Sequence, residues 1–303
     1  MSKIVGIGAC VMDTLVSVPN YPTEDTKLRA TAVKMAGGGP TATGLVAAQK
    51  LGELTQYIGV LSDDTGGVFL KQDFEKYDVD TSCIEVKRGF RSFTSNIWLS
   101  QASASRTCVF DKGNLPPLDL NDKQIEAIAQ AKLLMVDGNE LSAAVEGAKV
   151  AKAHDTKVLY DCGGLYEGVG ALLELTDIMI PSEEFALKYT GKESAEEAAV
   201  CLYEQYKPEI VVITQGERGG LSYDGKDIKY YPCFPTEVVD SNGSGDVFHG
   251  AFAAAIAKGF NYDTCCIFSS AVSSLKCRGV GARESVPDYD AVIRFLKEKG
   301  YDL

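Results

Sequence analysis

Short apolar runs rich in β-branched residues alternate with longer amphipathic segments through most of this 303-residue chain. Five of these runs have the length and composition of buried strands, at 3–9, 133–137, 157–161, 177–181 and 210–214. Segments with helical periodicity precede or follow them, at 121–132, 140–155 and 194–206. Parallel strands require such helical crossovers, and a strand covered on both faces is apolar along its length. The alternation therefore predicts an α/β fold, a mainly parallel sheet with helices on both faces.

Two segments interrupt this pattern. Residues 14–35 and 90–111 alternate with period two and are bounded by turn residues, which is typical of strands with one exposed face. We expect them to pair as one small β sheet that projects from the core as a lid. The predicted organisation is a core of residues 1–13, 36–88 and 112–303 and a lid of residues 14–35 and 89–111.

The C-terminal third has clearer local signals. Residues 219–234 predict a hairpin that turns at Asp224-Gly225. Helical patterns then follow at 245–258, 262–277 and 287–299.

Composition narrows the classes of partner. A net charge of −12 without a Lys/Arg cluster argues against nucleic acid and anionic membranes. The sequence contains no run of 18 apolar residues, so no membrane span is predicted. The start "MSKIVGIGAC" lacks the apolar region of a cleavable signal peptide, so a cytoplasmic location is expected. Nine cysteines without a CxxC pair are expected to be free, buried thiols. A small solute remains as the expected ligand.

Common nucleotide-binding and catalytic signatures are missing. "GIGACV" at 6–11 begins like a dinucleotide fingerprint, but Val11 stands where its third glycine belongs, and no GxxxxGK[ST] motif occurs. Only two histidines are present, which argues against histidine triads and histidine metal clusters. We expect ordinary structural roles for both, His154 at a helix end and His249 on a helix face.

The segment "DSNGSGDVFHGAF" at 240–252 carries the strongest chemical signal. Gly243, Ser244 and Gly245 precede an apolar helix, and the amides at a helix N-terminus form a site for anions. Asp246 lies just inside the helix, where the dipole favours its charged form. A proton acceptor beside an anion hole suits transfer of a phosphoryl group to a hydroxyl. The alternative is an ordinary helix start, where the same residue types are common.

This segment resembles the DTxGAGDxFxGA signature of ribokinase-like (PfkB) carbohydrate kinases, with Ser241 and Ser244 as small substitutions. Other segments resemble the family's motifs in the same order: "GIGACVMD" (6–13), "GGPTATGLVAAQKLG" (38–52), "IGVLSDDTGGVFL" (58–70), "VVITQGERGG" (211–220) and "GARESVP" (281–287). The resemblance covers nearly the whole chain. It implies a ribokinase-like fold and an ATP- and Mg²⁺-dependent transfer of the γ-phosphoryl group to a sugar hydroxyl.

The resemblance also implies roles for individual residues. Asp246 becomes the base, and the amides of Gly243, Ser244 and Gly245 become the hole for the transferring phosphate. Asp13, Gly38 and Gly39 would hold substrate hydroxyls, with Thr43 in the place of the family's asparagine. Thr214, Gly216 and Gly219 would lie along the nucleotide.

Two ion sites follow from the same resemblance. The family's NxxE motif aligns with "SEEF" at 182–185, so Ser182 replaces the asparagine on the nucleotide side and Phe185 replaces the glutamate. Glu184 is expected to organise Mg²⁺ instead, with Glu183 as the alternative. A monovalent cation, K⁺, is expected beside Asp240, Asn242, Gly281 and Ser285, although Asp240 alone also suits an ordinary turn.

The leading hypothesis is a sugar kinase. Asp13 and glycine backbone suit neutral hydroxyls, whereas a phosphorylated substrate needs cations, for which the lid offers Lys27, Arg29, Arg88, Arg91 and Arg106. Phe93, Trp98 and Phe110 would cover the sugar's apolar face or form a homodimer contact through the lid. The alternatives are a nucleoside or sugar-phosphate kinase of the same fold and a catalytically degenerate sugar-binding sensor.

Overall fold

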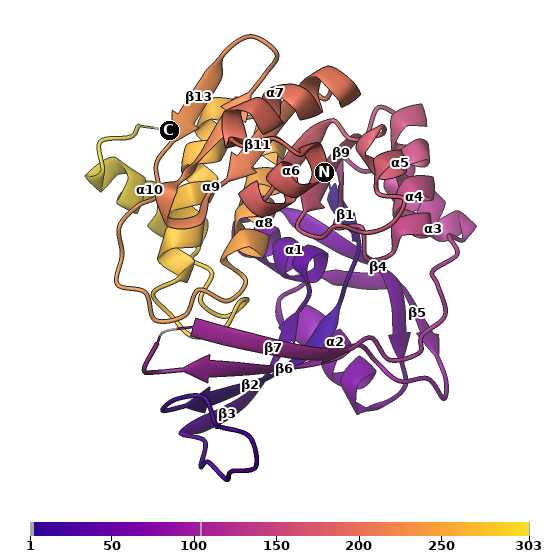
Figure 1. Ribbon diagram of the computed structural model, residues 1–303. Coiled ribbons are helices and arrows are strands. Elements are labelled where there is room, and N and C mark those ends of the chain that lie inside the picture. Colours follow the sequence, from indigo (N-terminus) through magenta and orange to yellow (C-terminus); the bar gives the residue numbers. More distant parts are fainter. Residues whose placement is uncertain (1–2, 104, 303) are drawn as a thin grey trace.

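The computed structural model describes residues 3–103 and 105–302, which form a large sheet between two layers of helices and a smaller sheet (Figure 1). The large sheet has the strand order β13-β12-β11-β10-β9-β8-β1-β4-β5. All its pairings are parallel except those of the terminal β11-β12-β13 meander. Its strands are β1 (Lys3–Ile7), β4 (Leu54–Ser62), β5 (Asp80–Lys87), β8 (Leu133–Val136), β9 (Lys157–Cys162), β10 (Ile178–Pro181), β11 (Ile210–Thr214), β12 (Gly220–Tyr223) and β13 (Ile228–Tyr231).

Apolar residues on the two faces of this sheet pack into two separate cores. Along β8, Leu133 and Met135 belong to one core, and Leu134 and Val136 belong to the other. The first core is covered by α1 (Pro40–Lys50), α2 (Thr65–Lys76), α8 (Ser244–Ala257), α9 (Tyr262–Lys276) and α10 (Tyr289–Glu298). The second is covered by α3 (Asp122–Ala129), α4 (Leu141–Ala153), α5 (Gly170–Leu173), α6 (Glu183–Thr190) and α7 (Ala195–Tyr206). The predicted α/β fold with helices on both faces is confirmed.

The smaller sheet lies at one end of the molecule, at the bottom of Figure 1. Its order is β3-β2-β6-β7, from β2 (Val11–Val18), β3 (Ala32–Gly38), β6 (Thr94–Ser100) and β7 (Ser105–Asp111). The two segments predicted to pair do so through the parallel strands β2 and β6. The strands extend beyond the predicted lid range, because β2 begins at Val11 and β3 ends at Gly38. Residue 104 of the predicted lid and residues 1, 2 and 303 of the predicted core lie outside the described residues.

The predicted local elements agree closely with the structure. Each of the five predicted strands and the three C-terminal helices is present within about two residues of its expected bounds. The hairpin turns where expected, and the Asp224 carboxylate accepts the amides of Lys226 and Asp227. Two strands were not predicted, β4 and β5, because their polar and apolar residues follow no clean period.

Helices α1 and α8 cross at two glycines, and this crossing positions the start of α8. A Cβ atom on Gly250 would lie only 2.1 Å from the backbone oxygen of Gly44. The backbones can therefore approach this closely only because Gly250 has no side chain. The segment before α1 and the first turn of α8 are thereby brought to the same edge of the sheet.

Two further expectations concern cysteines and membranes. All nine cysteines are free, and six of them are buried, whereas Cys108 is exposed. No helix among residues 3–103 and 105–302 is long and apolar enough to cross a membrane.

Candidate active site

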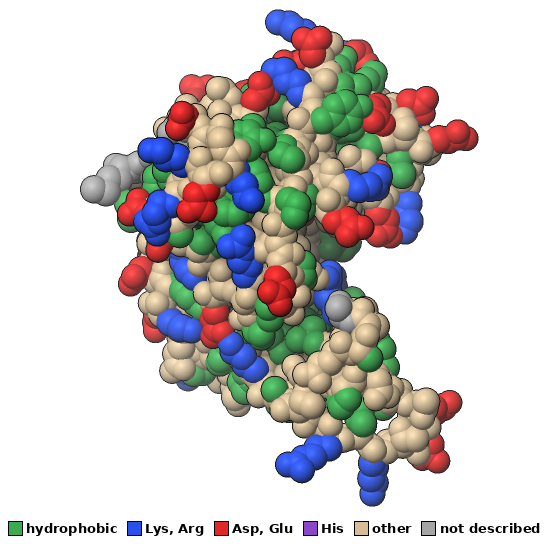
Figure 2. All heavy atoms as spheres, turned by 90° about the vertical axis from the view of Figure 1, so that its left-hand side faces the viewer, with side chains coloured by type: hydrophobic (Ala, Val, Ile, Leu, Met, Phe, Trp, Pro, Cys, Tyr) green, Lys and Arg blue, Asp and Glu red, His purple; other side chains and the backbone are tan. Residues whose placement is uncertain are grey.

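The predicted site residues gather at the carboxyl edge of the large sheet, where open α/β sheets bind ligands. The small sheet stands opposite this edge, and Figure 2 shows the molecule hollowed between the main body and the lower lobe that this sheet forms. A cavity of about 350 Å³ lies between the two parts. Ser17, Leu99 and Arg106 line it from the small sheet, and Asp240 and Val280 line it from the main body.

Asp246 lies in the first turn of α8 and is half-buried. Withdrawal from water raises the pKa of its carboxyl, whereas the positive side chains of His249, Arg106 and Lys276 favour the charged form. The negative charge of Asp137 adds to the upward shift. A carboxylate with a raised pKa and open access is suited to accept a proton.

The glycines before Asp246 provide an open helix N-terminus. Gly243 caps α8 in the left-handed conformation, with φ of 73°. The amide of Ser244 already donates to the carbonyl of Ser241, at 3.2 Å. Gly245 is exposed, and apart from its chain neighbours and the backbone of its own helix, no described heavy atom lies within 4 Å of the point where its Cβ would be. The amides of Gly245 and Asp246 belong to the first turn and have no intrahelical partner, so the space beside Gly245 can hold an anion.

His249 connects the start of α8 to the large sheet. Its Nδ1 lies 2.6 Å from the carbonyl of Gly245 and 3.2 Å from Asp161 Oδ2, and its Nε2 lies 3.0 Å from the carbonyl of Ile180. Both ring nitrogens thus face carbonyl oxygens, and the buried Asp161 carboxylate lies beside the ring. The sequence pattern predicts an ordinary helix-face histidine and carries no signal for this pair, because Asp161 is distant in sequence.

Asp13 lies on β2, on the side of the small sheet that faces the main body. Ser95 donates a hydrogen bond to its Oδ1, at 2.5 Å. Burial raises the pKa of Asp13 to about 6, and the negative charge of Asp246 contributes to the shift. Gly38 lies against the same carboxylate, since a Cβ there would be 2.0 Å from Asp13 Oδ2. The two predicted carboxylates therefore face one site from opposite walls.

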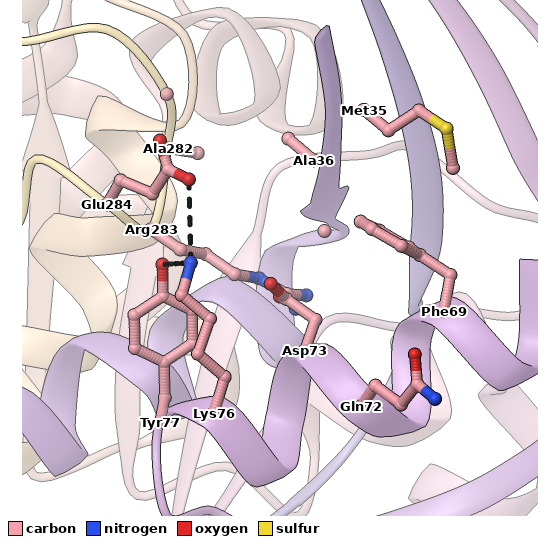
Figure 3. Close-up of a pocket in the computed structure, with 12 residues that line it drawn as sticks. Met35, Ala36, Phe69, Gln72, Asp73, Lys76, Tyr77, Ala282, Arg283 and Glu284 are labelled. Carbon is pink, nitrogen blue, oxygen red and sulfur yellow. Dashed lines mark hydrogen bonds and ion pairs between the residues drawn. The ribbon is translucent and has the colours of Figure 1, made fainter.

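Arg283 is a site residue that the sequence analysis did not identify. It is buried, it donates to the carbonyl of Gly38 at 2.7 Å, and it forms an ion pair with Asp73 of α2 at 2.6 Å. Figure 3 shows the Asp73 carboxylate beside the Arg283 guanidinium, in a pocket of about 200 Å³ next to the site. The predicted contact Thr43 is fully buried, and its hydroxyl faces Arg283 Nε at 3.5 Å. Thr43 and the Gly38 carbonyl therefore contact Arg283 behind the wall that carries Asp13.

Asp137, at the end of β8, fixes the backbone around this wall. Its Oδ2 accepts the amides of Ala9 and Thr41, at 2.9 and 3.0 Å, and its Oδ1 accepts the amide of Asn139 at 2.9 Å. One buried carboxylate thus joins the turn after β1 to the start of α1. The sequence carries a signal for this role, an aspartate directly after a buried strand, but the strand pattern alone predicts no more than the end of that strand.

The predicted nucleotide residues lie together. A cavity of about 110 Å³ is lined by Thr214 at the end of β11, by Gly216 and Gly219 in the loop that follows, and by Ser244 and Gly245 at the start of α8. The remaining lining residues were not predicted: Tyr231, Cys233, Phe248, Ser270, Ser273 and Ser274. The structure therefore joins the glycine-rich loop to the open helix N-terminus in one pocket.

The expected Mg²⁺ residues have different positions. Ser182 caps α6, and its hydroxyl accepts the amide of Phe185 at 3.2 Å. Glu184 points to solvent, with a side chain 75% exposed that pairs with Lys188. Glu183 instead contacts Gln215 Nε2, at 2.7 Å, and Arg218, both in the loop after β11. The geometry therefore favours Glu183 over Glu184, because successive helical residues point about 100° apart.

The four residues expected around a monovalent cation also lie together. Asp240 Oδ1 accepts the amide of Asn242 at 2.8 Å, and its Oδ2 accepts the amide of Gly281 at 2.9 Å. Ser285 donates to the carbonyl of Gly281 at 2.5 Å. A side chain that was not predicted is also present, because Lys276 Nζ donates to the carbonyls of Asp240 and Asn242.

Comparison with curated proteins finds relatives that match nearly the whole of this chain. The chain is 28% identical over 298 residues to ribokinase of Haemophilus influenzae, which covers 96% of this chain and 97% of the relative. It is 26% identical to 5-dehydro-2-deoxygluconokinase of Clostridium tetani, over 98% of this chain and 93% of the relative. It is 24% identical to a bifunctional ribokinase/ribose-5-phosphate isomerase A of Fructilactobacillus sanfranciscensis over 98% of this chain, and it spans 57% of that protein.

A solved structure has the same fold. Ribokinase of Arabidopsis thaliana, complexed with ribose and ATP, superimposes with a TM-score of 0.86 at 24% identity, over 98% of both chains. The model of the pfkB family carbohydrate kinases matches residues 1–289. Since that match spans nearly the whole chain and the family's motifs meet at one edge of the sheet, this chain belongs to the pfkB family of carbohydrate kinases and is a phosphotransferase.

Proposed function

We propose that the chain transfers the γ-phosphoryl group of ATP to a hydroxyl of a sugar, with Asp246 as the general base. One observation carries this proposal. Asp246 lies between the wall that holds Asp13 and the cavity that joins Thr214, Gly216 and Gly219 to the helix N-terminus. A hydroxyl held on the Asp13 side and a phosphate held on the Gly245 side would meet at this carboxylate.

Asp246 takes the proton of the acceptor hydroxyl as its oxygen attacks the γ-phosphorus. The bond between that phosphorus and the β–γ bridging oxygen breaks, and ADP leaves with the electron pair. The amides of Gly245 and Asp246, reinforced by the helix dipole, stabilise the charge on the transferring group. His249 holds the first turn of α8 through the Gly245 carbonyl, so these amides keep their orientation.

Mg²⁺ supplies charge neutralisation to the phosphates when it is bound. Residues 3–103 and 105–302 contain no cluster of three or more His, Cys, Asp or Glu that could hold a metal. A Mg²⁺ ion carried by phosphates needs only one or two protein carboxylates, and Glu183 is an acid beside the nucleotide loop. The residues present thus fit a metal held mainly by the nucleotide.

The proposed acceptor is a sugar without a phosphate group. Asp13 with Ser95 forms a hydrogen-bonding wall that suits neutral hydroxyls. Phe110 lies opposite Ser95 on the neighbouring strand and therefore on the same face of the sheet as Asp13, where it provides an apolar surface. Trp98 is on the opposite face of the sheet, since it lies three residues after Ser95, so it does not cover the sugar.

One observation favours a second class of acceptor. Arg106 lines the cavity between the small sheet and the main body, and its charge acts on Asp246. Of the five lid cations considered, Arg91 instead pairs with Asp111 at the surface. Arg106 would suit a sugar acid, in keeping with the relatives named 5-dehydro-2-deoxygluconokinase.

We also propose that the chain forms a homodimer through the outer face of the small sheet, the face opposite Asp13. Val33, Met35, Trp98 and Val109 are all exposed on this face. A second copy would cover this apolar surface by the same face, as in isologous dimers.

The test combines an acceptor panel with one substitution. Release of ADP is measured with free sugars, sugar acids, sugar monophosphates and nucleosides. We expect a free sugar or sugar acid to give the highest kcat/KM. Asp246→Asn is expected to lower kcat by about 10²- to 10⁴-fold with unchanged ATP binding, the usual contribution of a positioned base.

The panel separates the alternatives. An Arg106→Ala variant that loses acid acceptors but keeps neutral ones would assign the sugar-acid class. Near-normal turnover by Asp246→Asn would refute the proposal that Asp246 is the general base. Sugar binding in calorimetry without ADP release from any acceptor would favour a sugar-binding sensor over an enzyme.

A further inference from the structure

Lys276, the last residue of α9, has its ammonium group in the interior of the protein. The side chain is fully buried. Its Nζ donates to the carbonyl of Asp240 at 2.8 Å and to the carbonyl of Asn242. Both acceptors belong to the segment that leads into Gly243, the cap of α8. A lysine is almost never this buried without compensation, so these contacts must hold its charge.

The surrounding residues support a positive charge at this point. The Asp240 carboxylate is the strongest influence in favour of the charged form of Lys276, and Asp246 acts in the same direction. Burial is nevertheless the largest influence and lowers the pKa of Lys276 below its usual value, and the nearby Arg106 adds to this lowering. The Asp240 carboxylate also accepts the amides of Asn242 and Gly281, so it joins the α8 entry segment to the C-terminal loop.

This arrangement disagrees with the expected K⁺ site. K⁺ is held by rings of carbonyl oxygens, and here two carbonyls from the expected residues already accept hydrogen bonds from an ammonium. An ammonium and K⁺ carry the same charge, and each needs oxygen ligands. They cannot share these carbonyls, because the two ions would repel one another at contact distance. The residues present therefore do not fit a bound monovalent cation at this position.

We propose that Lys276 is a built-in cation, a tethered ammonium that orders the segment 240–243 and makes the protein independent of added monovalent cations. Lys276 is a positioning residue, because it acts through the backbone that carries Gly243 and Asp246. The kinetic part of this proposal rests on the proposed kinase function. Its structural part, the independence of the fold from K⁺, does not.

The first experiment uses the unaltered protein. The thermal midpoint, with and without ATP, and kcat for the best acceptor are measured in KCl and in choline chloride at equal ionic strength. We expect the same thermal midpoint and the same kcat in both salts. A midpoint or a kcat that is clearly higher in KCl would overturn the proposal. The thermal arm gives an answer even if no acceptor is phosphorylated.

The second experiment removes the ammonium. Lys276→Met keeps most of the length of the side chain without its charge, and Lys276→Ala leaves space for an external cation. In choline chloride, both are expected to lower kcat by about 10- to 100-fold through misplacement of the first turn of α8. KCl or propylammonium is expected to restore part of the kcat and of the thermal midpoint of Lys276→Ala.

Lys132→Met is the matched control. Lys132 Nζ also donates to a backbone carbonyl of α8, that of Ala257 at 2.6 Å, but at the far end of the helix. The kcat and the thermal midpoint of this variant are expected to be the same in KCl and in choline chloride. If Lys276→Met keeps full kcat in choline chloride, or if the loss in Lys276→Ala is the same in every salt, Lys276 only fills space and the proposal is wrong. If neither Lys276 variant folds, the salt response of the unaltered protein decides.

Discussion

Single side chains at the site are controlled by neighbours that the chain brings from far away. The ionisation of Asp13 depends on its burial and on Ser95 and Asp246, two residues that belong to different elements. The Gly38 carbonyl is occupied by Arg283, 245 positions later in the chain. The Asp161–His249 pair supports the turn that carries Asp246. At this scale, function depends on the electrostatic surroundings as much as on residue identity.

Asp13 should give a pH dependence with a definite sign. Its pKa is raised from 3.8 to about 6, so as the pH falls, Asp13 is protonated at a higher pH in the folded chain than in the unfolded chain. Ionised Asp13 therefore lowers stability above pH 6, and this cost disappears as the pH falls from 6 towards 4. The ionised carboxylate is proposed to accept a hydrogen bond from a sugar hydroxyl, and its fraction falls about tenfold for each pH unit below 6. The KM for the sugar should therefore rise about tenfold per pH unit below 6.

The measurement is a KM profile from pH 5 to 8 for Asp13→Asn and the unaltered protein. Asp13→Asn should bind sugar weakly, and its KM for the sugar should no longer change near pH 6. Its thermal midpoint at pH 7.5 should be no lower than that of the unaltered protein. The KM for ATP serves as the control and should keep its pH dependence. A sugar KM that is flat through pH 6 in the unaltered protein would exclude Asp13 from binding.

Between residues and the whole molecule, the crossing of α1 and α8 sets the geometry of the site. The Gly250–Gly44 contact fixes how closely the two helices approach, and the first turn of α8 moves with the rest of that rigid helix. An error in the crossing is therefore transmitted to Asp246, four residues from Gly250.

Gly250→Ala should separate the two helices. Its new Cβ would meet backbone at 2.1 Å, which no rotamer change can relieve, so the helix must shift. We expect a loss of about 1–3 kcal/mol in the free energy of unfolding, as for other overpacked cores, together with a lower kcat. Chemical denaturation and steady-state kinetics measure the two effects.

Gly245→Ala is the matched substitution in the same helix. Its Cβ would enter open space, so stability should change by less than about 0.5 kcal/mol, as at surface positions. Activity should nevertheless fall, because the methyl group enters the space assigned to the phosphate. Equal stability of the two variants would contradict the crossing argument.

At the scale of the whole molecule, the small sheet has two different faces. Asp13, Ser95 and Arg106 lie on the face towards the main body, whereas Val33 and Val109 are exposed on the other. The inner face lines the cavity opposite the main body, and the outer face has the apolar character of an interface.

Sedimentation should distinguish a dimer from a monomer. We expect the unaltered protein to sediment as a dimer and the double variant Val33→Lys/Val109→Lys to sediment as a monomer, because four buried ammonium groups would face one another across the two-fold axis. Leu54→Lys, which replaces an exposed apolar residue on the large sheet, is the control and should remain dimeric. A monomeric unaltered protein would refute the dimer.

The sequence by itself determined the elements and the chemistry that is local in the chain. The buried strands, the C-terminal helices and the open start of α8 follow from periodicity and from glycines next to Asp246, signals that lie within a dozen residues. The two period-two segments likewise predicted the small sheet, since alternation depends only on neighbouring residues.

Only the tertiary structure decided which of those residues are free to act. Glu183 and Glu184 are adjacent and chemically identical, and only the direction of α6 turns one to the loop after β11 and the other to solvent. Lys276 is an unremarkable lysine at a helix end until the fold places its ammonium at the Asp240 and Asn242 carbonyls, 36 and 34 positions away. Such contacts have no local signal, because they form only when packing brings distant backbone to a buried charge.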